Sequence, residues 1–412
     1  MYNNYILEKS NKFKTNFLTV RFMLDAKKEY ATISALLSIY LVYVNNIHKD
    51  FSSATKYLQE LYSTRFDINT TIKGDKLCFD FMTSFIASKY LNDKDYIEKV
   101  MNEFLAYIYD PLLVDGTFDQ ENFDIRKFDL ESRIKSTYDD KGSYAYEAFA
   151  KLFGQGKPFA INMGGYLEDL KDITKEDLLE FYHLLINQVP VVSGMFDEKD
   201  YDQVLSLLQA KIPSQDKDVY LDFYKIDSVD PYREVIESQD IVQSKFYMGF
   251  NIDNTLIFDD HASKLVFSSL FGLSSNSFLF KIVREQENLC YTIRANYDFY
   301  SNTVSVMAGI DKSNFEKTKD LVIKIKDKII AGDFSDEEFE DAKTVLIDMY
   351  EKQKDSQENS TFYRMNRTMC DLIPDLNKDI ASIKAVTRED VLRVGKKLHL
   401  NTVYLLSGDK NE

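Results

Sequence analysis

The chain has 412 residues, which is too long for a single hydrophobic core, so we expect two large domains. A net charge of −16 at pH 7 produces a field that repels phosphate backbones, and this argues against a nucleic-acid partner. No run of about eighteen apolar residues occurs, and the first residues show no apolar stretch behind a basic flank. We therefore expect a soluble, cytoplasmic protein with no membrane partner.

The elements of the first half are predicted from the spacing of its apolar residues. Residues 16–24 alternate between apolar and polar positions, as in a half-buried strand. A mostly helical stretch follows, then a strand at 76–81 and two long amphipathic helices. A closing helix leads into a buried strand at about Gly194.

The second half repeats this order. Alternating strands are predicted at 245–252 and 303–310, and long helices follow them. The half closes with a helix and an apolar strand that ends at Gly408.

Two short sequence blocks recur in the same order and indicate a duplication. Residues 173–178, ITKEDL, return as 386–391, VTREDV, and in both a Thr precedes an acidic pair, as at a capped helix start. Residues 116–124 match 332–340 at a similar spacing, and Lys127 continues the match onto Lys343. The alternative is that helix starts resemble one another by chance. Two blocks that recur in the same order at similar spacing favour a repeat.

These patterns predict an α+β fold made of two tandem homologous domains. Each domain should contain an antiparallel-rich mixed sheet covered by helices. We place the domains at 1–213 and 240–412, with the acidic stretch 214–239 as the linker.

The residues that most often bind metals are scattered along the chain. The cysteines and histidines are Cys78, Cys290, Cys370, His48, His183, His261 and His399. No CxxC pair occurs, and no two histidines lie within a helical turn or two of each other. We interpret the cysteines as buried or idle thiols, and a histidine-based site would need ligands from remote segments.

The most distinctive string is SFLFKIVREQENLCY at 277–291. It resembles the S-x-L-F-x-x-[IV]-R-E-x-x-G-L-x-Y signature in the second half of pitrilysin-type, insulinase-type and mitochondrial-processing-peptidase-like zinc peptidases. Gly249 and the turn at 271–275 extend the resemblance, and 173–178 is similar to a passage in the family's first half. Asn288 stands where the family prefers glycine, which should alter the turn before Tyr291 slightly.

The resemblance implies a zinc site that this chain lacks. Active members carry H-x-x-E-H on the first long helix, where two histidines bind zinc and the glutamate acts as general base. Here that helix is expected at about 34–41, SALLSIYL, and no His or Glu occurs between Ala31 and Ile47. His48 is alone and is interpreted as a solvated or capping residue. Glu131, at the position of the family's distal glutamate, is interpreted as a helical surface residue, so we expect no metal and no cofactor in this chain.

The resemblance also implies roles for Arg284 and Tyr291. In peptidases of this type the second half lends an Arg that grips a substrate carbonyl and a Tyr that donates to the developing oxyanion. The guanidinium of an arginine and the hydroxyl of a tyrosine suit these roles because both donate hydrogen bonds. The alternative reading is that Arg284 is a helix-end surface charge and Tyr291 an ordinary strand aromatic.

The chain is accordingly similar to a bacterial subgroup whose members lack the zinc motif. We expect a subunit that is inactive alone and that forms a heterodimer with a sibling bearing H-x-x-E-H and the zinc. Arg284 and Tyr291 would complete the sibling's site for processing peptides or leader sequences. The alternative is a scaffold or peptide-binding protein of the same fold with no part in proteolysis; a self-sufficient zinc peptidase would require ligands that the chain lacks.

Overall fold

A computed structural model describes residues 2–42, 44–217, 220–253 and 260–408. The chain divides into two compact units, each assembled from three segments. The first unit comprises Met1–Ser136, Asn162–Asp222 and Lys354–Pro374. The second unit comprises Thr137–Ile161, Phe223–Gln353 and Asp375–Glu412.

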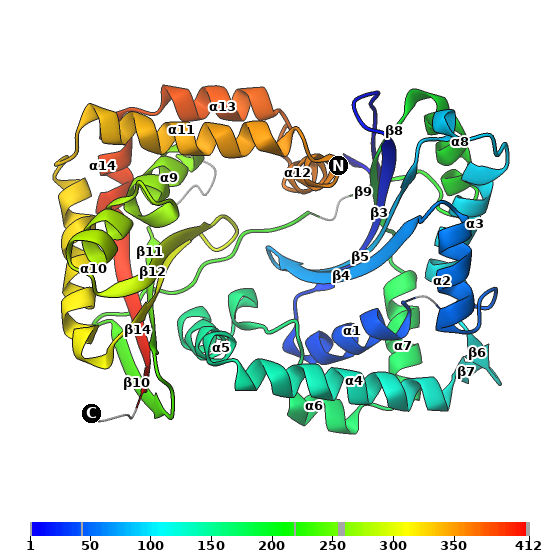
Figure 1. The fold of residues 1–412 in the computed structure, drawn as a ribbon, viewed down its shortest axis with the longest axis horizontal. Coiled ribbons are helices and arrows are strands. Elements are labelled where there is room, and N and C mark those ends of the chain that lie inside the picture. The colour runs from blue at the N-terminus through cyan, green and yellow to red at the C-terminus, as the bar shows by residue number, and fades with distance from the viewer. Residues whose placement is uncertain (1, 43, 218–219, 254–259, 409–412) are drawn as a thin grey trace. The chain divides into compact units, whose positions relative to one another are not determined.

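The first unit is built on a five-stranded mixed sheet in the order β2-β8-β3-β5-β4. Its strands are β2 (Tyr5–Lys9), β3 (Thr15–Asp25), β4 (Arg65–Lys73), β5 (Lys76–Ile86) and β8 (Val191–Phe196). β2 and β8 are parallel, and the other pairs are antiparallel. β3 is central and mostly buried, because α-helices cover one of its faces and a further helix covers the other (Figure 1).

The second unit repeats this sheet strand for strand, in the order β10-β14-β11-β13-β12. Its strands are β10 (Arg233–Gln239), β11 (Ser244–Ile252), β12 (Cys290–Asp298), β13 (Thr303–Ile310) and β14 (Leu398–Gly408). The one parallel pair is again at the corresponding edge, between β10 and β14. The predicted α+β fold of two homologous domains with antiparallel-rich sheets is therefore confirmed.

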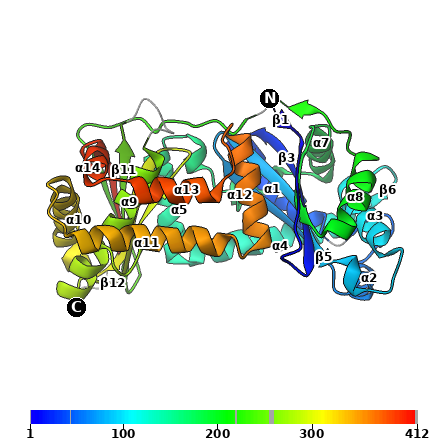
Figure 2. The same ribbon diagram turned by 90° about the horizontal axis from the view of Figure 1, so that it is seen from above.

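Helices cover both sheets, and short elements join them. In the first unit the helices are α1 (Lys28–Tyr40), α2 (Phe51–Glu60), η1 (Ser88–Tyr90), α3 (Tyr96–Tyr109), α4 (Gln120–Asp139), α6 (Leu167–Asp172), α7 (Lys175–Ile186), α8 (Glu198–Gln209) and α12 (Gln357–Met369), beside the short strands β1 (Tyr2–Asn3), β6 (Leu113–Val114), β7 (Thr117–Phe118) and β9 (Asp216–Lys217). In the second unit they are α5 (Lys141–Gly154), η2 (Pro158–Ala160), α9 (His261–Ser268), η3 (Ser269–Leu273), η4 (Leu279–Gln286), η5 (Lys312–Asn314), α10 (Phe315–Ile330), α11 (Asp336–Gln353), α13 (Leu376–Ala385) and α14 (Arg388–Lys396). α11 lies beside α13 in both views (Figures 1 and 2).

The duplication extends to individual hydrogen bonds. Thr174 and Thr387 begin α7 and α14, and each forms a complete capping box with the Asp three residues later. The ammonium group of Lys127 donates to the carbonyl of Ile173, the residue before the first cap, at 2.7 Å. Lys343 in the second unit donates to the corresponding carbonyl, that of Val386, at 3.4 Å. Both repeated sequence blocks thus form equivalent contacts.

One helix of each unit comes from the opposite half of the chain. α12, from the second half, packs on β8 and β3 of the first sheet, while α5, from the first half, packs on β14 and β11 of the second sheet. The sequence analysis did not foresee this exchange, because it depends on packing between remote segments. The stretch 214–239, which was expected to be a linker, contains strand β10.

A buried ion pair holds α12 on the first sheet. The guanidinium of Arg21 on β3 donates to both carboxylate oxygens of Asp80 on β5, at 2.7 and 2.8 Å. Both side chains are 1% exposed. A further Arg21 nitrogen donates to the amide oxygen of Asn366 on α12 at 2.7 Å. Charges this deeply buried are tolerated only when their hydrogen bonds are satisfied, so Arg21 couples two strands to the helix.

Aromatic stacking holds α5 on the second sheet. Phe149 stacks on Tyr247 of β11, with ring centroids 5.2 Å apart. Phe153 packs directly on Gly249, where an added Cβ atom would lie 2.6 Å from the Phe153 ring. Glycine at this position is therefore a packing requirement. Among the described residues, no helix combines the length and apolar character needed to cross a lipid bilayer.

We predict that Asp80→Leu lowers the free energy of unfolding by about 3–5 kcal/mol, because it leaves the buried Arg21 charge without a counter-ion. The double variant Arg21→Met with Asp80→Leu should lose much less, because no charge is then buried. Urea unfolding followed by circular dichroism measures both. Equal losses in the single and double variants would contradict this view of the pair.

We also predict that Thr174→Ala and Thr387→Ala each lower the free energy of unfolding by about 1 kcal/mol, because each removes the same capping hydrogen bond. Thr174→Ser and Thr387→Ser retain a hydroxyl and are the controls. Thermal unfolding of the four variants makes the comparison. A large loss at one cap and none at the other would show that the two starts are not equivalent.

Candidate functional site

Tyr291 lies on a free edge of the second sheet. β12 is the last strand in the sheet order and pairs only with β13 in the described part of the chain. The pairing register shifts between Cys290 and Ile293, so the strand bulges at Tyr291. Bulges of this kind redirect side chains and are common beside active sites. The Tyr291 side chain is 80% exposed, which leaves its hydroxyl accessible to a ligand.

Arg284 lies in the last turn of η4, a segment of π-helix. Leu279 and Val283 anchor that segment in the core, and the Arg284 guanidinium lies 4.3 Å from the centre of the Phe280 ring. No carboxylate among the described residues lies within ion-pair distance of Arg284. Its planar set of donors is therefore available to a carbonyl or carboxylate from outside.

A short turn links these two residues and fixes their backbone. The amide of Glu287 donates to the carbonyl of Ile282, and the amide of Leu289 donates to that of Val283, both at 3.0 Å. Asn288 has a φ of +52°, in the left-handed region that glycine adopts readily. Asparagine tolerates this conformation better than most residues, so the turn forms without the glycine that the family prefers.

The charge of Arg284 acts on Cys290, the residue that precedes Tyr291. Burial raises the pKa of the Cys290 thiol to about 11, and the positive charge of Arg284 opposes this rise. Because Cys290 directly precedes Tyr291, the guanidinium acts on the start of β12. The structure thus brings the two predicted residues to one end of η4 and β12, but whether they bind substrate stays a prediction.

The helix expected to carry zinc ligands is α1, and its inner face is a core surface. No His or Glu occurs in it after Glu29. The buried residues of α1 are Ala31, Thr32, Ser34, Ala35, Leu36, Leu37 and Tyr40. Such side chains offer no metal ligands beyond weak hydroxyls, so this face does not fit a zinc ion.

The two isolated candidates near α1 have structural partners. Glu131 accepts a hydrogen bond from Lys135 on the same helix at 2.5 Å, and this bond lowers the pKa of its carboxyl. His48, expected to be solvated or capping, is instead mostly buried, and its Nε2 lies 3.4 Å from a carboxylate oxygen of Glu103. The other oxygen of Glu103 accepts from Asn45 at 2.9 Å. Among the described residues no three His, Cys, Asp or Glu side chains form a metal-binding group.

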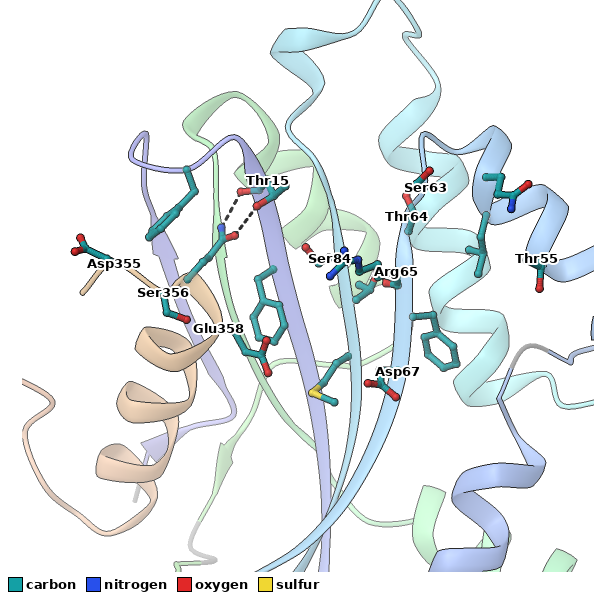
Figure 3. A pocket seen from close by; sticks show the side chains of 18 of the residues that line it. Thr15, Thr55, Ser63, Thr64, Arg65, Asp67, Ser84, Asp355, Ser356 and Glu358 are labelled. Atoms are coloured by element: carbon teal, nitrogen blue, oxygen red, sulfur yellow. Dashed lines mark hydrogen bonds between the residues drawn. The ribbon is translucent and has the colours of Figure 1, made fainter. Parts of the chain in front are cut away.

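The first unit contains a cavity of about 870 Å³ that the sequence analysis missed (Figure 3). It lies against β3, β5 and β4, between the start of α12 and α2, and all its lining residues belong to this unit. We call it the β4 trough. Residues 65–73, where Phe66 is buried between exposed neighbours, carry a weak alternation that could have indicated an edge strand. The trough itself depends on α12, which is remote in sequence.

Comparison with known proteins shows which family the chain is similar to. The family described as Peptidase M16 inactive domain matches residues 172–346. A protein named probable inactive metalloprotease YmfF, from Bacillus subtilis (strain 168), is 27% identical over 403 residues, which cover 97% of this chain and 94% of the relative. The chain is similar to the M16 family, the pitrilysin type of metallopeptidases. Both matches carry names that describe inactive members of this peptidase type.

Solved structures share the fold along the whole chain. A conserved protein from Enterococcus faecalis V583 has a TM-score of 0.91 at 24% identity, and the match covers 99% of this chain and 97% of that one. An M16 inactive domain from Pseudomonas fluorescens has a TM-score of 0.77 at 16% identity, covering 99% and 95%. A protease from Helicobacter pylori also reaches 0.77, at 12% identity, covering 98% and 96%. At these identities the likeness concerns the M16 fold alone.

We predict that Arg284→Ala raises the pKa of Cys290 further, because it removes the cation that stabilises the thiolate. Only the thiolate reacts with iodoacetamide, so labelling of Cys290 at about pH 9 should slow severalfold. Cys78 and Cys370 are buried and should react little. Arg294→Ala is the control and should leave the labelling rate of Cys290 unchanged. If Arg284→Ala also leaves that rate unchanged, the charge of Arg284 does not act on Cys290.

Proposed function

We propose that this chain is a non-catalytic subunit of a two-chain zinc peptidase. In this proposal Arg284 and Tyr291 complete a site whose zinc is held by a sibling with an intact H-x-x-E-H motif. The observation that carries the proposal is the combination of an 80% exposed Tyr291 and an Arg284 without a described carboxylate partner, joined by one fixed turn. The substrate would be a short peptide or an extended segment of a precursor.

The chemistry of peptide hydrolysis explains why these two residue types would be needed. Attack on a peptide carbonyl places negative charge on its oxygen, and donors held in position stabilise that charge. A tyrosine hydroxyl donates one hydrogen bond, while an arginine donates two parallel bonds to neighbouring carbonyl oxygens. Both side chains would act as hydrogen-bond donors, so neither would compete with the general base in the sibling's half of the site.

The rest of the chain supports an accessory role. The inner face of α1 consists of core residues where the resemblance implies zinc ligands, so in this proposal the sibling supplies the metal-activated water. η4 is anchored by Leu279 and Val283, which keeps the turn rigid. Donors on rigid elements lose little entropy when substrate binds, which is what transition-state stabilisation requires.

We predict that a mixture of this chain with its H-x-x-E-H sibling cleaves peptides that neither chain cleaves alone. Tyr291→Phe and Arg284→Ala should each lower kcat by about 10²–10³-fold, the usual cost of removing one oxyanion donor. Gel filtration should show that both variants still bind the sibling. Cleavage of a fluorogenic peptide at saturating sibling concentration provides the measurement.

Matched controls separate a role at the site from general damage. Tyr90→Phe and Arg133→Ala change an exposed tyrosine and an exposed arginine of the first unit, and both should leave kcat unchanged. If Tyr291→Phe and Arg284→Ala behave like these controls, the chain is a scaffold or peptide-binding protein. Stoichiometric zinc in the isolated chain would contradict both functions.

A further inference from the structure

One face of the second sheet is open at β12 and β13. Ile293 and Ala295 of β12 belong to the hydrophobic core and are almost fully buried. Successive side chains of a strand point to opposite faces, so Arg294, which lies between them, points away from the core. Arg294 is exposed, and Met307, its partner on β13, is 38% exposed. A charged and an apolar side chain therefore lie next to each other on this open face.

The open part of the face begins where the cover by α5 ends. Tyr247 on β11 is directly opposite Met307 on β13, and Met307 is directly opposite Arg294 on β12. Residues that pair across strands share one face of a sheet, so the three form a row. Phe149 of α5 stacks on Tyr247, which is buried. The row thus passes from a covered ring to an exposed thioether and then to an exposed guanidinium.

Arg294 carries a charge that no described residue neutralises. Its guanidinium takes part in no ion pair or hydrogen bond among the described residues. A guanidinium donates two parallel hydrogen bonds to a carboxylate, a geometry that the ammonium group of a lysine does not offer. The side chain of Met307 is flexible and apolar, so it adapts to the carbon atoms of a ligand. Together the two side chains suit a carboxylate on a short apolar stem, as in aspartate or glutamate.

The same strand carries Tyr291, the residue proposed to meet the substrate. Arg294 follows Tyr291 by three residues, which is at most about 10 Å along a strand. The bulge between Cys290 and Ile293 leaves both Tyr291 and Thr292 exposed. An extended peptide advances by about 3.3 Å per residue. A substrate that runs along β12 with a carbonyl at Tyr291 therefore brings a side chain about three residues away to Arg294.

We propose that Arg294 binds a carboxylate of the substrate, so that this chain selects peptides with an acidic residue about three positions from the cleaved bond. Met307 packs against the methylene groups of that residue. The inference rests on the proposed function, in which Arg284 and Tyr291 meet the substrate, and it adds the class of peptide selected. Arg294 binds away from the cleaved bond, so it determines specificity and takes no part in the chemical step.

The first test compares peptides that differ in one residue. Fluorogenic nonapeptides of alternating alanine and valine carry a single aspartate, asparagine or lysine at each position in turn, and the mixture of this chain with its H-x-x-E-H sibling cleaves them. At the position that faces Arg294, aspartate should lower KM about fivefold relative to asparagine. The value of kcat should stay unchanged, because a contact away from the reacting bond stabilises substrate and transition state equally.

Variants of the protein assign that preference to Arg294. Arg294→Gln should remove the difference between the aspartate and asparagine peptides, and Arg294→Glu should reverse it in favour of the lysine peptide. Lys378→Gln removes an exposed cation of α13 and is the matched control, which should keep the preference for aspartate. Thermal unfolding shows whether each variant is folded. The charge reversal keeps the test decisive, because a damaged protein loses affinity for all peptides alike.

Binding measured without cleavage separates this inference from the proposed function. Fluorescence anisotropy with the isolated chain should show that a labelled aspartate peptide binds about fivefold more tightly than its asparagine counterpart. Cleavage that depends on Tyr291 but shows no preference for aspartate overturns the role of Arg294 and leaves the proposed function intact. A binding preference that Arg294→Glu reverses, together with no sibling-dependent cleavage, retains the role of Arg294 and rejects the shared active site. If neither assay distinguishes aspartate from asparagine, the inference is overturned.

Discussion

The buried pair between Arg21 and Asp80 determines how the first unit is built. Two ionised side chains that are 1% exposed require complete hydrogen bonding, and the sheet alone does not provide it. Asn366 of α12 supplies a further acceptor, so the first sheet requires a helix encoded more than three hundred residues later. The start of that helix forms one wall of the β4 trough, so the same interaction that satisfies Arg21 also positions Glu358.

In the second unit, aromatic rings hold the exchanged helix on the sheet. α5 places Phe149 and Phe153 on β11, and Gly249 provides the space that Phe153 needs. Each unit is thus completed by a helix from the other half of the chain. The inner face of α1, where the resemblance implies zinc ligands, consists of core residues.

Much of this architecture was predictable from the sequence, because it is encoded locally. The capping boxes at Thr174 and Thr387 depend on four-residue patterns, and the central strands depend on apolar alternation. The motif at 277–291 identified the family by resemblance, and it located the turn that carries Arg284 and Tyr291.

Other features arise only when remote segments meet. β2 and β10 are short edge strands with one parallel partner each, and their local sequence gives little signal. The burial of His48 against Glu103 and the exchange of α5 and α12 depend on tertiary packing. The β4 trough combines the edge of β4 with the start of α12, so no pattern within either segment predicts it.

The most direct test of the central claim is to ask whether position 291 touches substrate only when the sibling is present. Tyr291 would be replaced by a photo-crosslinking phenylalanine derivative, and the chain mixed with a labelled peptide and a sibling whose general-base glutamate is replaced by glutamine. We expect ultraviolet light to link the peptide to position 291 only with the sibling present, and excess unlabelled peptide to suppress the link. The same derivative at position 90 is the control and should give no link. If the peptide binds the mixture but gives no link at position 291 either, a shared active site is contradicted.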